Sequence, residues 1–122
     1  MALTRKEIKE FLDEKRIGVL GINRDGQPPQ LLPVWFLYED GIIWMMSEKR
    51  VAKVENMKKD PRVALSVDDP IFPYKGVVAY GTVTFSEMNI KETRTAIATK
   101  YLGREQGEAY VNQPRVHGVV LL

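Results

Sequence analysis

The sequence predicts a mainly β fold in which six antiparallel strands form a small barrel with flanking helices. Short segments of alternating apolar and polar residues recur along the chain between turn residues, which is typical of small barrels. Three other segments carry apolar residues at helical spacing: one at the start, one between the third and fourth strands, and one before the last strand. With 122 residues, the chain is expected to form a single domain over residues 1–122.

One helix and two strands begin the chain. Thr4 and Glu7 have the spacing of a capping box, which predicts a helix that ends near Arg16. Residues 17–23 form a short apolar run and residues 30–38 form another, with turn residues between them. These two runs are the first and second predicted strands.

The second predicted strand is apolar on both faces. A strand of this kind needs a core on one side and a ligand or a second subunit on the other. Pro33 lies within the strand and cannot donate a hydrogen bond to a neighbour, so it indicates an edge strand or a bulge.

The rest of the chain predicts four more strands and two more helices. The strands are expected at residues 42–47, 62–68, 77–86 and 116–122, and the helices at residues 47–60 and 89–102, the second ending at Gly103. The sequence stops inside an apolar run at Leu122. Since domains rarely end on a buried strand, we expect a short C-terminal tail beyond this residue.

Composition excludes several kinds of chemistry. There is no cysteine and only one histidine, His117, so the sequence predicts no metal site and no identifiable catalytic residue. The side chains are therefore poorly equipped for difficult chemistry, and a bound cofactor is the natural alternative. A net charge of +2 does not favour nucleic acid, and no apolar run is long enough to cross a membrane. With no signal peptide either, we expect a cytoplasmic protein.

The segment after the third strand is the most informative for function. Arg50 and Lys53 are three residues apart near a predicted helix start, where backbone amides and the helix dipole favour a phosphate. The alternative is the solvated side of a surface helix. Trp35 of the second strand is expected beside Met45 and Met46 of the third, where it would form either a flat surface for a ring or part of the core.

Four segments together resemble the flavin- and deazaflavin-dependent oxidoreductases with a split β-barrel, the superfamily of pyridoxamine 5′-phosphate oxidase. They are IGVLGINRDGQPPQLLPVWFLYEDGIIW at residues 17–44, AKVENMKKDPRVALSVDD at 52–69, PYKGVVAYGTVT at 73–84 and KYLG at 100–103. The chain looks most like the small proteins described as F420-dependent enzymes. The resemblance implies a six-stranded antiparallel split β-barrel.

The resemblance also implies a homodimer with the cofactor, F420 or FMN, at the subunit interface. The ring would lie against Gln30, Leu32, Pro33, Val34, Trp35, Met45, Met46 and Ser47, and the phosphate against Lys49, Arg50, Val51, Ala52 and Lys53. Lys53 matches the phosphate motif of the family. Val51 stands where that motif has a second basic residue, so Arg50 or Lys49 would replace it.

The function that this resemblance implies is hydride transfer between the cofactor and a small organic substrate, without nucleic-acid or membrane partners. The alternative is a non-catalytic protein of the same fold that binds or carries a cofactor or haem. Turnover with a reductant and an acceptor distinguishes the two.

Overall fold

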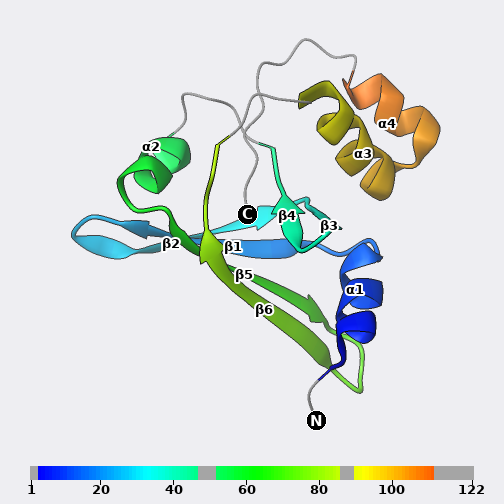
Figure 1. Cartoon of the computed structure of the whole chain (residues 1–122), viewed down its shortest axis with the longest axis horizontal. Coiled ribbons are helices and arrows are strands. Elements are labelled where there is room, and N and C mark those ends of the chain that lie inside the picture. Colours follow the sequence, from blue (N-terminus) through cyan, green and yellow to red (C-terminus); the bar gives the residue numbers. More distant parts are fainter. Residues whose placement is uncertain (1–2, 47–51, 86–89, 112–122) are drawn as a thin grey trace.

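The computed structural model of the chain describes residues 3–46, 52–85 and 90–111. Its main feature is an antiparallel sheet of four strands (Figure 1), which are β1 (Gly18–Arg24), β2 (Gln27–Val34), β5 (Arg62–Asp69) and β6 (Lys75–Thr82). They lie in the order β2-β1-β5-β6, so β2 and β6 are the edges of the sheet that the described residues form. A separate two-stranded sheet pairs β3 (Leu37–Glu39) with β4 (Ile42–Trp44).

Helices flank these sheets, and those within the described ranges are α1 (Arg5–Asp13), α2 (Ala52–Lys59), α3 (Ile90–Leu102) and α4 (Arg104–Val111). The predicted capping box of α1 is confirmed. The Glu7 N–H donates to Oγ1 of Thr4, and the Thr4 N–H donates to Oε1 of Glu7, each at 3.1 Å. α1 ends at Asp13, a little earlier than expected. No helix in the described part of the chain has the length and apolar character to span a bilayer.

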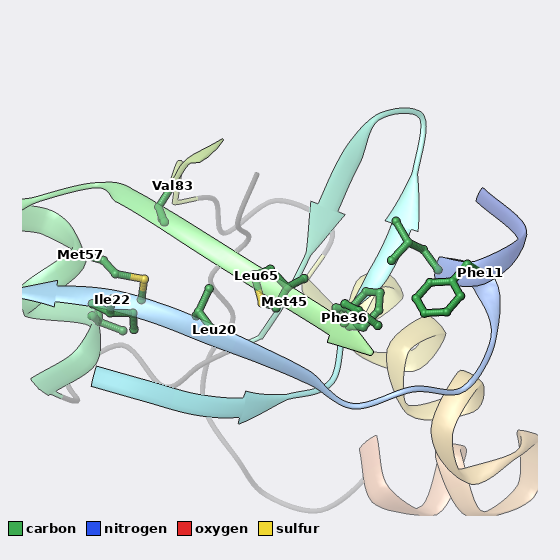
Figure 2. Packing of buried hydrophobic residues seen from close by; sticks show 11 residues of the cluster. Phe11, Leu20, Ile22, Phe36, Met45, Met57, Leu65 and Val83 are labelled. Carbon is green, nitrogen blue, oxygen red and sulfur yellow. The ribbon is translucent and has the colours of Figure 1, made fainter. Parts of the chain in front are cut away.

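The core lies between one face of the main sheet, the β3–β4 hairpin and helices α1 and α2. Along β1, Leu20 and Ile22 point inward, as the period of two in a strand requires. Figure 2 shows Ile22 near Met57 of α2 toward one end of this core, and Phe36 near Phe11 of α1 toward the other. Ile22 and Phe36 are completely buried.

The expected six-stranded barrel needs correction. The mainly β, antiparallel class with flanking helices is confirmed, but the described residues form a four-stranded and a two-stranded sheet and no single closed barrel. The strand predicted at residues 30–38 divides into β2 and β3, because Phe36 turns into the core and its N–H bonds to a helix side chain instead of a strand. The strand predicted at residues 116–122 lies outside the described residues.

Helix α4 was not predicted; the sequence indicated only a polar stretch there. Gly107 lies inside α4, and a glycine lowers the helix propensity of such a segment. The glycine is needed for packing, since a Cβ at this position would come within 2.9 Å of the Cα and N of Thr99 on α3. Close contact between α3 and α4 therefore depends on the absence of a side chain. The predicted end of α3 at Gly103, which has φ 83°, is confirmed.

Candidate functional site

The break between β2 and β3, at Trp35 and Phe36, is held by a tyrosine from α3. The hydroxyl of Tyr101 accepts the Phe36 N–H at 3.2 Å and donates to the carbonyl oxygen of Arg16 at 2.5 Å. Burial raises the pKa of this hydroxyl, which keeps it protonated and able to donate. The Tyr101 ring lies parallel to the Trp35 indole, with centroids 5.0 Å apart and an interplanar angle of 4°. Tyr101 therefore positions both residues of the break.

Lys100, the neighbour of Tyr101, holds the same region from a second direction. Its Nζ donates to the carbonyl oxygens of Leu12 at 2.8 Å and of Phe36 at 3.0 Å, and lies 4.0 Å from the centre of the Phe36 ring. Burial lowers the pKa of Lys100 to about 8. We call Lys100 and Tyr101 the α3 clamp. Both residues belong to the KYLG segment, but no local pattern in the sequence predicts a role for them.

A cavity of about 310 Å³ opens beside this break. We call it the α3 pocket; it is lined by Pro33, Val34, Trp35, Met46, Arg94, Ile97 and Ala98. Its two walls are the end of β2 with the residues that follow it, and one face of α3. On α3 the lining residues are three and four positions apart, the spacing of side chains on one helix face. Ile97 and Ala98 are buried, so this face of α3 is packed within the molecule.

The structure brings together four of the residues that the sequence analysis assigned to the cofactor ring. Pro33, Val34, Trp35 and Met46 all line the α3 pocket. The other described ring residues, Gln30, Leu32 and Met45, are not among its lining residues. Met45 is part of the core. Leu32 pairs with Leu20 across the two strands, and Gln30 pairs with Ile22, so both lie on the inward face of the sheet.

The residues assigned to the phosphate lie at the start of α2 or just before it. Ala52 and Lys53 belong to the first turn of this helix. Ser47, Lys49, Arg50 and Val51 lie outside the described residues. The expected helix at residues 47–60 is thus described only over Ala52–Lys59, and the phosphate site stays a prediction.

The pocket also contains a residue that the sequence analysis missed. Arg94 lines the α3 pocket and is half-buried. A basic residue on a predicted amphipathic helix is usually part of the solvated face, which is why the pattern drew no attention to it. Its spacing from Ile97 and Ala98, three and four residues, is the only signal that places it on the inner face.

The outer face of the main sheet is apolar and open. In the strand register Leu31, Gly21, Ala64 and Tyr80 form one row across the sheet, and the adjacent row includes Val19 and Val78. The exposed fractions of the large members are high: 68% for Leu31, 83% for Tyr80, 51% for Val78 and 40% for Val19. Scattered exposed apolar residues are ordinary, but a contiguous face of this kind marks an interaction surface.

Comparisons with known proteins identify this architecture. The family profile described as pyridoxamine 5′-phosphate oxidase matches residues 4–119. Among solved structures, the conserved hypothetical protein Rv2991 from Mycobacterium tuberculosis has a TM-score of 0.85 and 23% identity, over 99% of this chain and 79% of that one. An F420 reductase has a TM-score of 0.72 and 21% identity, over 93% of this chain and 90% of that one.

Two other structures extend the range of the fold. An FAD-binding protein from Mesorhizobium loti has a TM-score of 0.69 and 24% identity, over 98% of this chain and 87% of that one. The heme storage protein HutZ from Vibrio cholerae has a TM-score of 0.67 and 14% identity, over 96% of this chain and 85% of that one. Curated protein sequences give no significant match. Because the profile covers nearly the whole sequence, this chain belongs to the pyridoxamine 5′-phosphate oxidase family of split-barrel proteins.

Proposed function

We propose that this chain is an oxidoreductase that binds F420 or FMN and transfers a hydride between the cofactor ring and a small organic substrate. The observation that carries the proposal is the α3 pocket, where four residues expected along the ring come together in one cavity. The fold is that of an F420 reductase and of an FAD-binding protein, which supports a flavin-type cofactor.

The lining of the α3 pocket fits the ring of such a cofactor. Pro33, Val34 and Met46 offer apolar surface, and Trp35 is held in a fixed orientation by the Tyr101 stack. When bound, a flavin or deazaflavin supplies the hydride transfer itself. The side chains of this chain would bind the ring, orient it toward the substrate and exclude water from the α3 side.

The phosphate of the cofactor is proposed to bind at the start of α2. Lys53 lies in the first turn of this helix, where unpaired backbone amides and the helix dipole attract anions. Lys49 and Arg50 precede the helix in sequence and would supply the second positive charge that Val51 lacks. The ring and the phosphate would thus bind to neighbouring segments of the chain.

The functional unit is proposed to be a homodimer with the cofactor at the subunit interface. Support comes from the open apolar face of the main sheet, where Leu31 and Tyr80 are largely exposed. Removing such a face from water contributes roughly 25 cal/mol per Å² of apolar surface, which offsets the entropy that two chains lose on association. The second strand, apolar on both faces, then has the core on one side and the partner subunit on the other.

The central test is titration of the purified protein with FMN and with F420. Binding in the micromolar range, followed by reduction and reoxidation of the bound cofactor in the presence of a reductant and an acceptor, is the expected result. Absence of binding by both cofactors would overturn the proposal.

The phosphate site is tested separately with Lys53→Ala. A charge-assisted hydrogen bond contributes about 1.5–3 kcal/mol, so the affinity for FMN is expected to fall roughly tenfold to a hundredfold. Affinity for riboflavin, which has no phosphate, should stay unchanged. The control is Lys59→Ala, which removes the same charge from the last turn of α2, where the side chain is exposed. Equal losses in both variants would show a diffuse charge effect and refute the proposed phosphate contact.

A second candidate is a non-catalytic protein that binds or carries haem. One fold relative is a heme storage protein and another is a heme-binding protein from Mycobacterium smegmatis, which is the specific observation in its favour. Addition of hemin would then give a shifted Soret band at stoichiometric ligand, and no turnover would follow with flavin and reductant. The single histidine, His117, lies outside the described residues.

A further inference from the structure

Arg94 is the one charged side chain among the described residues that line the α3 pocket. It lies on α3 one turn before Ile97 and Ala98, which are buried and line the same pocket. Side chains three and four residues apart share a helix face, so α3 presents Arg94 to the same cavity as these two residues. Helix α3 contacts β3 (Figure 1), and Arg94 of this helix lines the same cavity as Trp35, which follows β2.

The remaining lining of the pocket is uncharged: Pro33, Val34, Trp35, Met46, Ile97 and Ala98. A guanidinium is always protonated and presents a planar set of donors that matches a carboxylate. Its attraction to an anion is stronger beside apolar walls than in open water. A cavity of about 310 Å³ is at the small end of pockets that bind organic molecules.

We propose that the α3 pocket binds an organic carboxylate, whose anionic group pairs with Arg94 and whose apolar body lies against Ile97 on the same helix face. The strand-side residues of the pocket stay available to the ring of the proposed cofactor. A carboxylate at Arg94 makes the substrate class of the proposed oxidoreductase small apolar or aromatic carboxylic acids. Only the redox role of the substrate rests on the proposed function. Recognition of the carboxylate depends on the pocket alone and is measured without any cofactor.

The probes are 2-naphthoate and 2-naphthamide, which share a ring system and differ in charge. Equilibrium dialysis with the full chain gives a Kd for each. The naphthoate is expected to bind roughly tenfold more tightly than the amide. In Arg94→Met, binding of naphthoate is expected to weaken by the same factor, with the amide changed by less than about twofold. Arg94→Lys keeps the charge without the planar fork and should lie between the two.

The matched control is Lys91→Met, because Lys91 is an exposed residue one turn earlier on the same helix. This variant removes the same charge from α3 outside the pocket, and its Kd for naphthoate should stay within about twofold of the parent value. Thermal unfolding of all three variants checks that each one folds. If Arg94→Met fails to fold, Arg94→Lys and the comparison of the two probes on the parent protein still decide the question.

Several outcomes would overturn the proposal. Equal affinity of the parent protein for 2-naphthoate and 2-naphthamide would show that the pocket does not distinguish a carboxylate from a neutral amide. If Arg94→Met and Lys91→Met lose affinity for naphthoate equally, the net charge of α3 explains the binding and no specific contact with Arg94 is needed. If Arg94→Met weakens FMN but not riboflavin, and leaves naphthoate unchanged, then Arg94 holds the cofactor phosphate and not a substrate. Failure of FMN and F420 to bind to the parent protein, with naphthoate still selected by Arg94, would refute the redox function and keep the carboxylate site.

Discussion

Removing one hydroxyl group from the α3 clamp, by Tyr101→Phe, should destabilise the fold strongly for so small a change. The Tyr101 side chain is 2% exposed, and its hydroxyl both accepts from the Phe36 N–H and donates to the Arg16 carbonyl. A typical hydrogen bond contributes about 1 kcal/mol, and a buried group left without its partner costs about 1–3 kcal/mol more. The expected loss in the free energy of unfolding is therefore roughly 2–4 kcal/mol. The phenylalanine ring keeps the stack on Trp35, so only the hydrogen bonds are tested.

Urea denaturation at neutral pH, followed by circular dichroism, measures this change through the transition midpoint at constant m-value. The control is Tyr74→Phe, which removes the same hydroxyl from a side chain that is 72% exposed and keeps its edge contact with Phe72. Surface substitutions of this kind change stability by less than about 0.5 kcal/mol. A loss in Tyr101→Phe no larger than in Tyr74→Phe would refute the role of the clamp.

Two other predictions concern pH and assembly. The pKa of Lys100 is lowered by burial to about 8, so between about pH 8 and its ordinary value of 10.5 the unfolded chain binds more protons, and stability should rise with pH across this window. Urea denaturation at several pH values measures the rise, and a rise of the same size in Lys100→Met would contradict it. Leu31→Lys places a charge on the open sheet face, so the dimer expected by light scattering should dissociate while circular dichroism stays unchanged. Ile71→Lys, at a position of similar exposure in the β5–β6 loop, is the control; a dimer in both variants would exclude this face as the interface.

Local patterns predicted the elements that depend on local contacts. The capping box at Thr4 places the start of α1, because both of its hydrogen bonds join residues three apart. The β1–β2 hairpin follows from the turn residues between two apolar runs. Pro33 was expected on an edge strand or at a bulge, and among the described strands of its sheet β2 has a neighbour on one side only.

Contacts between distant residues could not be predicted in this way. The break after β2 depends on Tyr101, which is 65 residues beyond Phe36 in the chain, and no pattern within the strand indicates it. Helix α4 was missed because Gly107 weakens the local helix signal, while the contact with Thr99 that requires this glycine is visible only in three dimensions.

The candidate site shows the same division. Trp35 and Met46 were expected to be neighbours because they flank one hairpin, and both line the α3 pocket. Arg94 comes from a helix whose packing partner was unknown, so it could not be distinguished from an ordinary surface residue. The residues proposed to hold the phosphate, Lys53 among them, stay a prediction.

The proline content of β2 has a consequence for how copies of this chain can associate. Three of its eight residues, Pro28, Pro29 and Pro33, lack an N–H, and among the described strands β2 is an edge of the main sheet. An exposed edge strand normally templates the addition of another strand, which leads to aggregation, and proline is one of the residues that prevents it. Backbone N–H positions alternate between the two edges of a strand, so Pro29 and Pro33 share one edge and Pro28 faces the other. At least one donor is missing on either edge, which disfavours a continuous ladder across two copies. Contact through the sheet face uses no backbone donors, so the prolines of β2 disfavour edge-to-edge growth at this strand and leave face-to-face contact unaffected.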